Sequence, residues 1–112
     1  MAAVGLPYNT QRNSPDLLVM IEASLACQSI RRTGSAAINL AYVAAGRADV
    51  FWSFSTKIWE IAAGALLIRE AGGVVTGPLG QPVELDNGQF LAAATKPLHE
   101  RFVGLIRRTV GP

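Results

Sequence analysis

The chain has 112 residues, of which half are hydrophobic and only 16% are charged. This length suits one domain, so we expect residues 1–112 to form a single domain. Charged residues usually make up about 25% of a soluble domain, and the deficit here predicts apolar surface that meets another chain or domain. The net charge of +2 comes without a dense basic run, so it does not support nucleic-acid binding.

The cysteine content and the length of the apolar runs indicate in which cellular compartment the protein is expected. Cys27 is the single cysteine, which excludes an intrachain disulfide and a cysteine-based zinc site and fits a reducing environment. No run approaches the roughly 18 consecutive apolar residues of a membrane span, and the first residues lack the basic region of a signal peptide. We therefore expect a cytoplasmic protein without a membrane partner.

Hydrophobic periodicity and turn residues predict alternating strands and helices along the chain. The predicted elements are a strand over 2–6, a helix over 14–28, a strand-like connector at 30–32, a helix over 34–46, a strand over 48–54, a helix over 57–71, strands over 74–76 and 90–94, and a helix over 95–109. Ser14-Pro15-Asp16 is the clearest helix start, with a capping hydroxyl, a proline in the first turn and an acid near the positive helix end. This order predicts an α/β fold, a layered αβα arrangement with a mixed central sheet.

The stretch from Ser55 to Gly73 is the most informative for function. A strand ends there, a helix begins, and Glu60 lies in the first helical turn. A carboxylate beside a strand end is well placed to hold a divalent cation, since ligands of open α/β sheets gather at the carboxyl ends of strands. A simpler interpretation is also open: the helix dipole alone favours an acid at this position by about 0.3–1 kcal/mol.

Three segments carry a resemblance to a known family. The first consists of two short runs, Trp59-Glu60-Ile61-Ala62-Ala63-Gly64 and Glu70-Ala71-Gly72-Gly73. Together these runs resemble the C-terminal signature of the inositol monophosphatase family. Two further family segments are similar to the run Arg31-Arg32-Thr33-Gly34-Ser35-Ala36-Ala37 and to residues 42–49. All three segments lie in the order and at the spacing of the family. The resemblance covers about residues 4–110 and implies the C-terminal subdomain of that fold.

The resemblance implies a magnesium-dependent phosphomonoesterase that hydrolyses inositol monophosphate or a related sugar phosphate with a metal-activated water. Glu60 occupies the position of a metal-binding aspartate, and its side chain is longer by roughly 1.5 Å. Gly34, Ser35 and Ala36 match the segment that lines the substrate ring, although they also suit a helix N-cap. Ser53 stands where the inositol enzymes often place a glutamate, so the resemblance leaves the substrate open.

Most metal ligands of the family are missing from this chain. It has eight acidic residues, no two of which adjoin, and it lacks the paired glutamates and the Asp-Pro loop of the family's first half. Two-metal hydrolysis needs several converging carboxylates, so we expect this chain alone to be inactive. The alternative is a non-catalytic remnant that acts as a binding or oligomerisation module. In both cases an uncovered sheet edge and apolar face predict a homo-oligomer.

Other residues have structural interpretations. His99 is expected to form a solvated surface pair with Glu100 rather than to act as a base. Asp49 is expected to end the connection into its strand, although a place near the active-site wall is possible. Trp52 and Trp59 are expected in the core or at an interface.

Overall fold

The computed structural model describes residues 2–4, 11–26, 30–31, 43–46, 49–54, 58–83 and 88–110. The elements are β1 (Ala2–Val4), α1 (Pro15–Ala26), β2 (Ile30–Arg31), β3 (Val50–Ser53), α3 (Ile58–Glu70), β4 (Val74–Thr76), β5 (Phe90–Ala93) and α4 (Lys96–Val110). They follow the predicted order. Most of the helix predicted over 34–46 lies outside the described residues, but Gly46 adopts a φ of 76°, the left-handed conformation with which helices commonly end.

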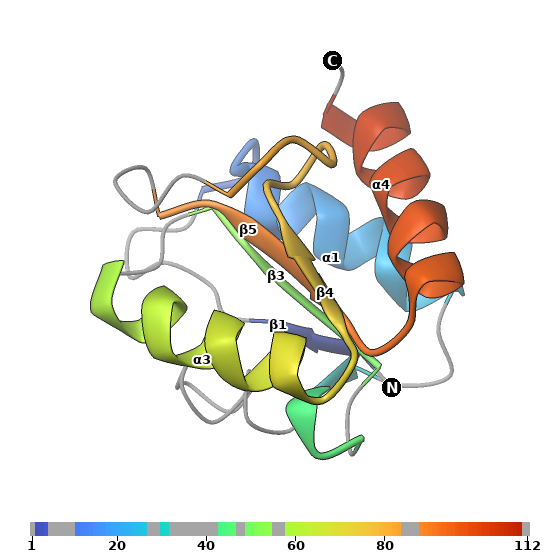
Figure 1. Cartoon of the computed structure of the whole chain (residues 1–112). Coiled ribbons are helices and arrows are strands. Elements are labelled where there is room, and N and C mark those ends of the chain that lie inside the picture. The colour runs from blue at the N-terminus through green and yellow to red at the C-terminus, as the bar shows by residue number, and fades with distance from the viewer. Residues whose placement is uncertain are drawn as a thin grey trace.

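The strands form one five-stranded mixed sheet in the order β2-β1-β3-β5-β4. β1 runs parallel to β2 and β3, whereas β5 runs antiparallel to β3 and β4. Figure 1 shows α3 on one face of the sheet and α1 with α4 on the other. The predicted layered αβα arrangement with a mixed central sheet is therefore confirmed.

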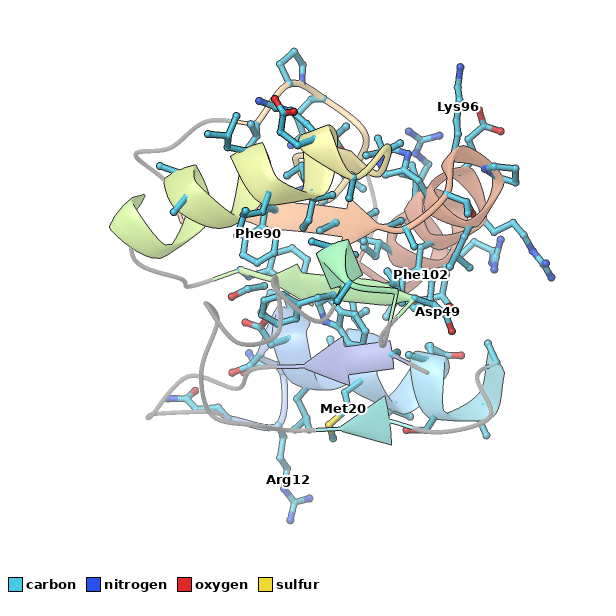
Figure 2. The ribbon with its side chains drawn as sticks, turned by 60° about the horizontal axis from the view of Figure 1, so that its bottom comes forward. Arg12, Met20, Asp49, Phe90, Lys96 and Phe102 are labelled. Carbon is cyan, nitrogen blue, oxygen red and sulfur yellow. The ribbon has the colours of Figure 1, made fainter. Side chains whose placement is uncertain are left out.

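Two apolar cores lie on the two faces of the sheet, because successive residues of a strand point to opposite sides. The core beneath α1 and α4 includes Val50, Trp52, Leu91, Ala93 and Phe102. The core beneath α3 includes Phe51, Phe90, Ala92, Ala65 and Ile68. Figure 2 shows Phe90 and Phe102 in these two separate layers. β3 and β5 are buried along their whole length, so they form the centre of the fold.

The buried stripe of α1 differs from the one that its large aliphatic residues suggest. Its buried residues are Asp16, Val19 and Ala23, whereas Ile21 is 50% exposed and Leu25 is 81% exposed. Val19 and Ala23, one helical turn apart, pack into the core shared with α4, and Ile21 and Leu25 lie on the other side of the helix. α1 therefore presents an apolar outer face. Among the described residues, no helix is both long and apolar enough to cross a bilayer.

Candidate functional site

Two of the predicted site residues, Ser53 and Glu60, belong to elements that end or begin near one edge of the sheet. Parallel strands end at the same edge, so the carboxyl ends of β1, β2 and β3 meet there. Ser53 is the last residue of β3, and Glu60 lies in the first turn of α3. Gly34, Ser35 and Ala36 follow the end of β2 in sequence, but they lie outside the described residues, as does the Glu60 side chain.

Ser53 is buried, with 3% of its surface exposed, at the point where β3 reaches this edge. Strand alternation places it on the same face as Phe51, the face that α3 covers. Four peptide units separate Phe54 from Ile58, so the start of α3 lies within about 15 Å of the end of β3. The structure thus puts Ser53 and the first turn of α3 on one side of the same sheet edge.

Asp16 is a further residue of this edge, and its role could not be deduced from the sequence. Its Oδ1 accepts a hydrogen bond of 3.0 Å from the backbone N–H of Phe54, directly after Ser53. The side chain is 2% exposed, and burial raises the pKa of Asp16 to about 6, while the bond from Phe54 opposes this rise. The helix-start pattern located the acid but could not show its partner 38 residues away. Asp16 therefore anchors the backbone that leads from Ser53 toward α3.

Asp49 lies at the opposite end of β3 from Ser53. Its carbonyl oxygen accepts a hydrogen bond of 2.9 Å from the backbone N–H of Ala94, which closes the amino end of the strand. Four residues of extended chain place Asp49 about 13 Å from Ser53. This position, at the amino end of β3, agrees with a role for Asp49 in the connection into the strand.

The prediction that His99 forms a solvated surface pair is wrong. His99 is 7% exposed, and its Nε2 lies 2.7 Å from the hydroxyl oxygen of Thr76 on β4. Burial lowers the pKa of His99, and the nearby charge of Glu100 opposes this shift. His99 lies three residues before Phe102 and seven before Ile106, so helical spacing already places it on the buried face of α4. The prediction overlooked this signal in favour of the neighbouring Glu100. His99 thus joins α4 to an edge strand.

A complete metal site is not present among the described residues. These residues contain no group of three histidine, cysteine or acidic side chains that could hold an ion. Magnesium requires several oxygen ligands in near-ideal octahedral geometry, and Glu60 could supply at most one or two of them. The described part of the chain therefore does not fit a two-metal centre by itself.

A mixed sheet between helical layers, with the buried Ser53 at the carboxyl end of β3, defines a layered α/β protein. Comparison with known families makes the assignment specific. The chain belongs to the inositol monophosphatase family, whose sequence model matches residues 2–110.

Several curated relatives are similar over most of this chain. It is 47% identical over 89 residues to an inositol-1-monophosphatase of Mesorhizobium japonicum, a match that covers 79% of this chain and 34% of that protein. It is 42% identical over 99 residues to Nus factor SuhB of Pseudomonas aeruginosa, covering 86% and 36% respectively. The chain therefore spans about a third of the length of the curated relatives it matches.

Solved structures agree with the fold. An inositol monophosphatase from Anabaena superposes with a TM-score of 0.88 at 32% identity, over 96% of this chain and 43% of that chain. The extragenic suppressor protein suhB from Bartonella henselae also gives a TM-score of 0.88, at 33% identity, over 97% and 42%. The described fold is thus part of a larger fold in both neighbours.

Proposed function

We propose that this chain forms the C-terminal, substrate-binding half of a magnesium-dependent phosphomonoesterase that acts on inositol monophosphate or a related sugar phosphate. The supporting observation is the buried Ser53 at the carboxyl edge, on the face of the sheet that α3 covers. Family membership supports the phosphatase class, because residues 2–110 match the family model. The Mesorhizobium relative bears the name of an inositol-1-monophosphatase.

In this proposal each site residue has a defined role. Glu60 is a metal ligand, Gly34, Ser35 and Ala36 line the sugar ring, and the Ser53 hydroxyl hydrogen-bonds a substrate hydroxyl. Asp16 positions the backbone between Ser53 and α3 through its bond to Phe54. Hydrolysis by a metal-activated water needs further carboxylates, and we propose that the missing N-terminal half supplies them. Without that half the chain is expected to be inactive.

Reconstitution tests the proposal directly. We would co-express the chain with the part of the Mesorhizobium japonicum relative that it does not match and measure magnesium-dependent phosphate release from inositol 1-phosphate. The pair should release phosphate, and the chain alone should not. Glu60→Gln should abolish release, Glu60→Asp should increase it, and Glu22→Gln on the exposed side of α1 is the matched control. Turnover by the chain alone, or by a pair carrying Glu60→Gln, would refute the proposed division of the site.

The outer face of α3 supports the proposed association with another polypeptide. Ala62 and Ala63 are exposed, Leu66 is 61% exposed and Leu67 is 53% exposed. We propose that this face packs against the missing half or, without it, against a second copy of the chain. Light scattering at tens of micromolar should then show dimers or larger assemblies, and a clean monomer would contradict self-association. We further propose a cytoplasmic location, which the single cysteine supports.

A non-catalytic binding module is the second candidate. Its support is that Glu60 and Ser53 depart from the family residues at two functional positions. In addition, several relatives with 40–44% identity carry the name Nus factor SuhB rather than that of a phosphatase. In this case the reconstituted pair should form a stable complex that releases no phosphate, even with Glu60→Asp. Release of phosphate by that pair would exclude the second candidate.

A further inference from the structure

An open groove runs between α1 and α4 on the outer face of the fold, away from α3. It consists of two adjoining cavities of about 290 and 210 Å³. Ala26, Leu105 and Arg108 line both cavities, so the two form one continuous surface, which we call the α1–α4 groove. This groove plays no part in the candidate site at the carboxyl edge.

The walls of the α1–α4 groove combine apolar side chains with charged ones. Leu25 lines one cavity, and Leu98 and Phe102 line the other. Leu25 is 81% exposed, and Ile21, one helical turn before it on α1, is 50% exposed. Large aliphatic side chains that gather beside a groove and face water indicate a surface for a partner, because their burial would be favourable.

Two arginines give the α1–α4 groove a positive charge. Arg101 lines the second cavity and Arg108 lines both. They are seven residues apart on α4, so their Cα atoms lie about 10.5 Å apart along one side of the helix. Neither forms an ion pair with any residue in the described ranges. Arg107, by contrast, donates a hydrogen bond of 3.4 Å to the carbonyl oxygen of Leu79 and is turned away. Glu22, the one acid that lines the groove, lies at the end formed by α1.

We propose that the α1–α4 groove binds an acidic amphipathic helix of a partner protein. A helix that carries carboxylates at positions i and i+7 repeats the spacing of Arg101 and Arg108. Its apolar residues at i+3 and i+4 would then contact Leu25, Phe102 and Leu105. This mode of recognition places an apolar helical stripe in a groove and lets charged pairs at the rim set the register.

Other occupants fit the α1–α4 groove less well. The two cavities, of about 290 and 210 Å³, form an open surface groove, whereas small-molecule sites usually enclose most of their ligand. A fatty acid has one carboxylate and cannot engage two guanidinium groups that lie two helical turns apart. A two-fold contact between copies of this chain would bring the arginines of both copies into one interface, with only Glu22 of each copy to offset them.

A designed peptide tests the proposal with the 112-residue chain. The probe is a fluorescein-labelled helical peptide with two glutamates seven residues apart and leucines at the third and fourth positions after the first glutamate. Fluorescence anisotropy should show saturable binding. Arg101→Glu and Arg108→Glu should each weaken binding roughly fivefold to tenfold, since each replaces an attraction by a repulsion. Leu25→Ser should weaken it similarly, and circular dichroism should show that each variant remains folded.

Arg12→Glu is the matched control, because it makes the same charge change at an exposed residue. Figure 2 shows Arg12 at the far side of the molecule from Lys96, the first residue of α4. Equal weakening by Arg12→Glu would overturn the proposal in favour of non-specific attraction. So would equal binding of a peptide whose glutamates are five residues apart. Two other results would also overturn the proposal: self-association of the chain, or its binding to anionic phosphatidylglycerol vesicles. In either case the association would have to depend on Arg101 and persist in the presence of excess peptide. None of these measurements depends on phosphatase activity.

Discussion

The stability of the fold should depend on pH through Asp16. Its pKa lies at about 6 in the folded chain against an ordinary value of 3.8. Because the folded state holds this proton more tightly, Asp16 contributes stability below pH 3.8 that is lost as the pH rises through 6. The difference in pKa corresponds to at most about 3 kcal/mol, of which about 1–2 kcal/mol falls between pH 4.5 and the folded pKa. Asp16→Asn removes the charge but keeps an oxygen that can accept from Phe54.

Urea unfolding of the wild-type chain and Asp16→Asn between pH 4.5 and 8 tests this expectation. The variant should gain about 1–2 kcal/mol relative to the wild type as the pH rises from 4.5 to about 6, and the difference should level off above pH 6. The titration of His99 occurs in both proteins and cancels in the difference. Asp16→Ala should be less stable than Asp16→Asn by about 1–3 kcal/mol at every pH, because the Phe54 N–H loses its acceptor. A difference between wild type and Asp16→Asn that stays constant over this range, or changes only near pH 4, would refute the reasoning.

Three further changes test the packing. Because the folded pKa of His99 is lowered, its contribution to stability should fall as the pH drops through 6.5. Urea unfolding between pH 7.5 and 5.5 should show this dependence of stability on pH in the wild type and not in His99→Gln. The same dependence in both proteins would contradict the reasoning. Gly73→Ala should destabilise by about 3 kcal/mol or more, because a Cβ there would lie 2.6 Å from a side-chain carbon of Ile68. Gly72→Ala, with a φ of 86° and open space, should cost only about 1–2 kcal/mol, so equal melting temperatures would argue against the close contact. Trp52→Phe should change stability by no more than about 1 kcal/mol. The buried Nε1 of Trp52 has no partner in the described part of the chain, so its removal offsets the lost packing. A loss of about 3 kcal/mol in calorimetry would refute this compensation.

Local patterns in the sequence were sufficient for the elements and for the family. Alternation of strands and helices gave the αβα layers, and the Trp59–Gly64 and Glu70–Gly73 segments carried the family resemblance that the comparison confirms. The glycine pair at the end of α3 and the cap at Ser14 marked helix boundaries that the structure reproduces within one or two residues. Such signals are local, because caps, turns and hydrophobic periods involve residues close together in the chain.

Contacts between distant segments were decided only by the tertiary structure. The bond from Phe54 to Asp16 and the burial of His99 against Thr76 join residues 38 and 23 positions apart. No local pattern records which residues form such pairs. The helical spacing of His99 with Phe102 and Ile106 indicates that it faces the core, but not that Thr76 is its partner.

Tertiary packing also decided which face of α1 is exposed. The spacing of aliphatic residues on α1 indicated a helix but not which side would be buried. In the structure Val19 and Ala23 face the core and Leu25 faces outward. The sequence by itself therefore determined the elements, the layered class and the family of this chain. Packing decided which face of each helix became core, which acid became an anchor at the carboxyl edge, and where the α1–α4 groove formed.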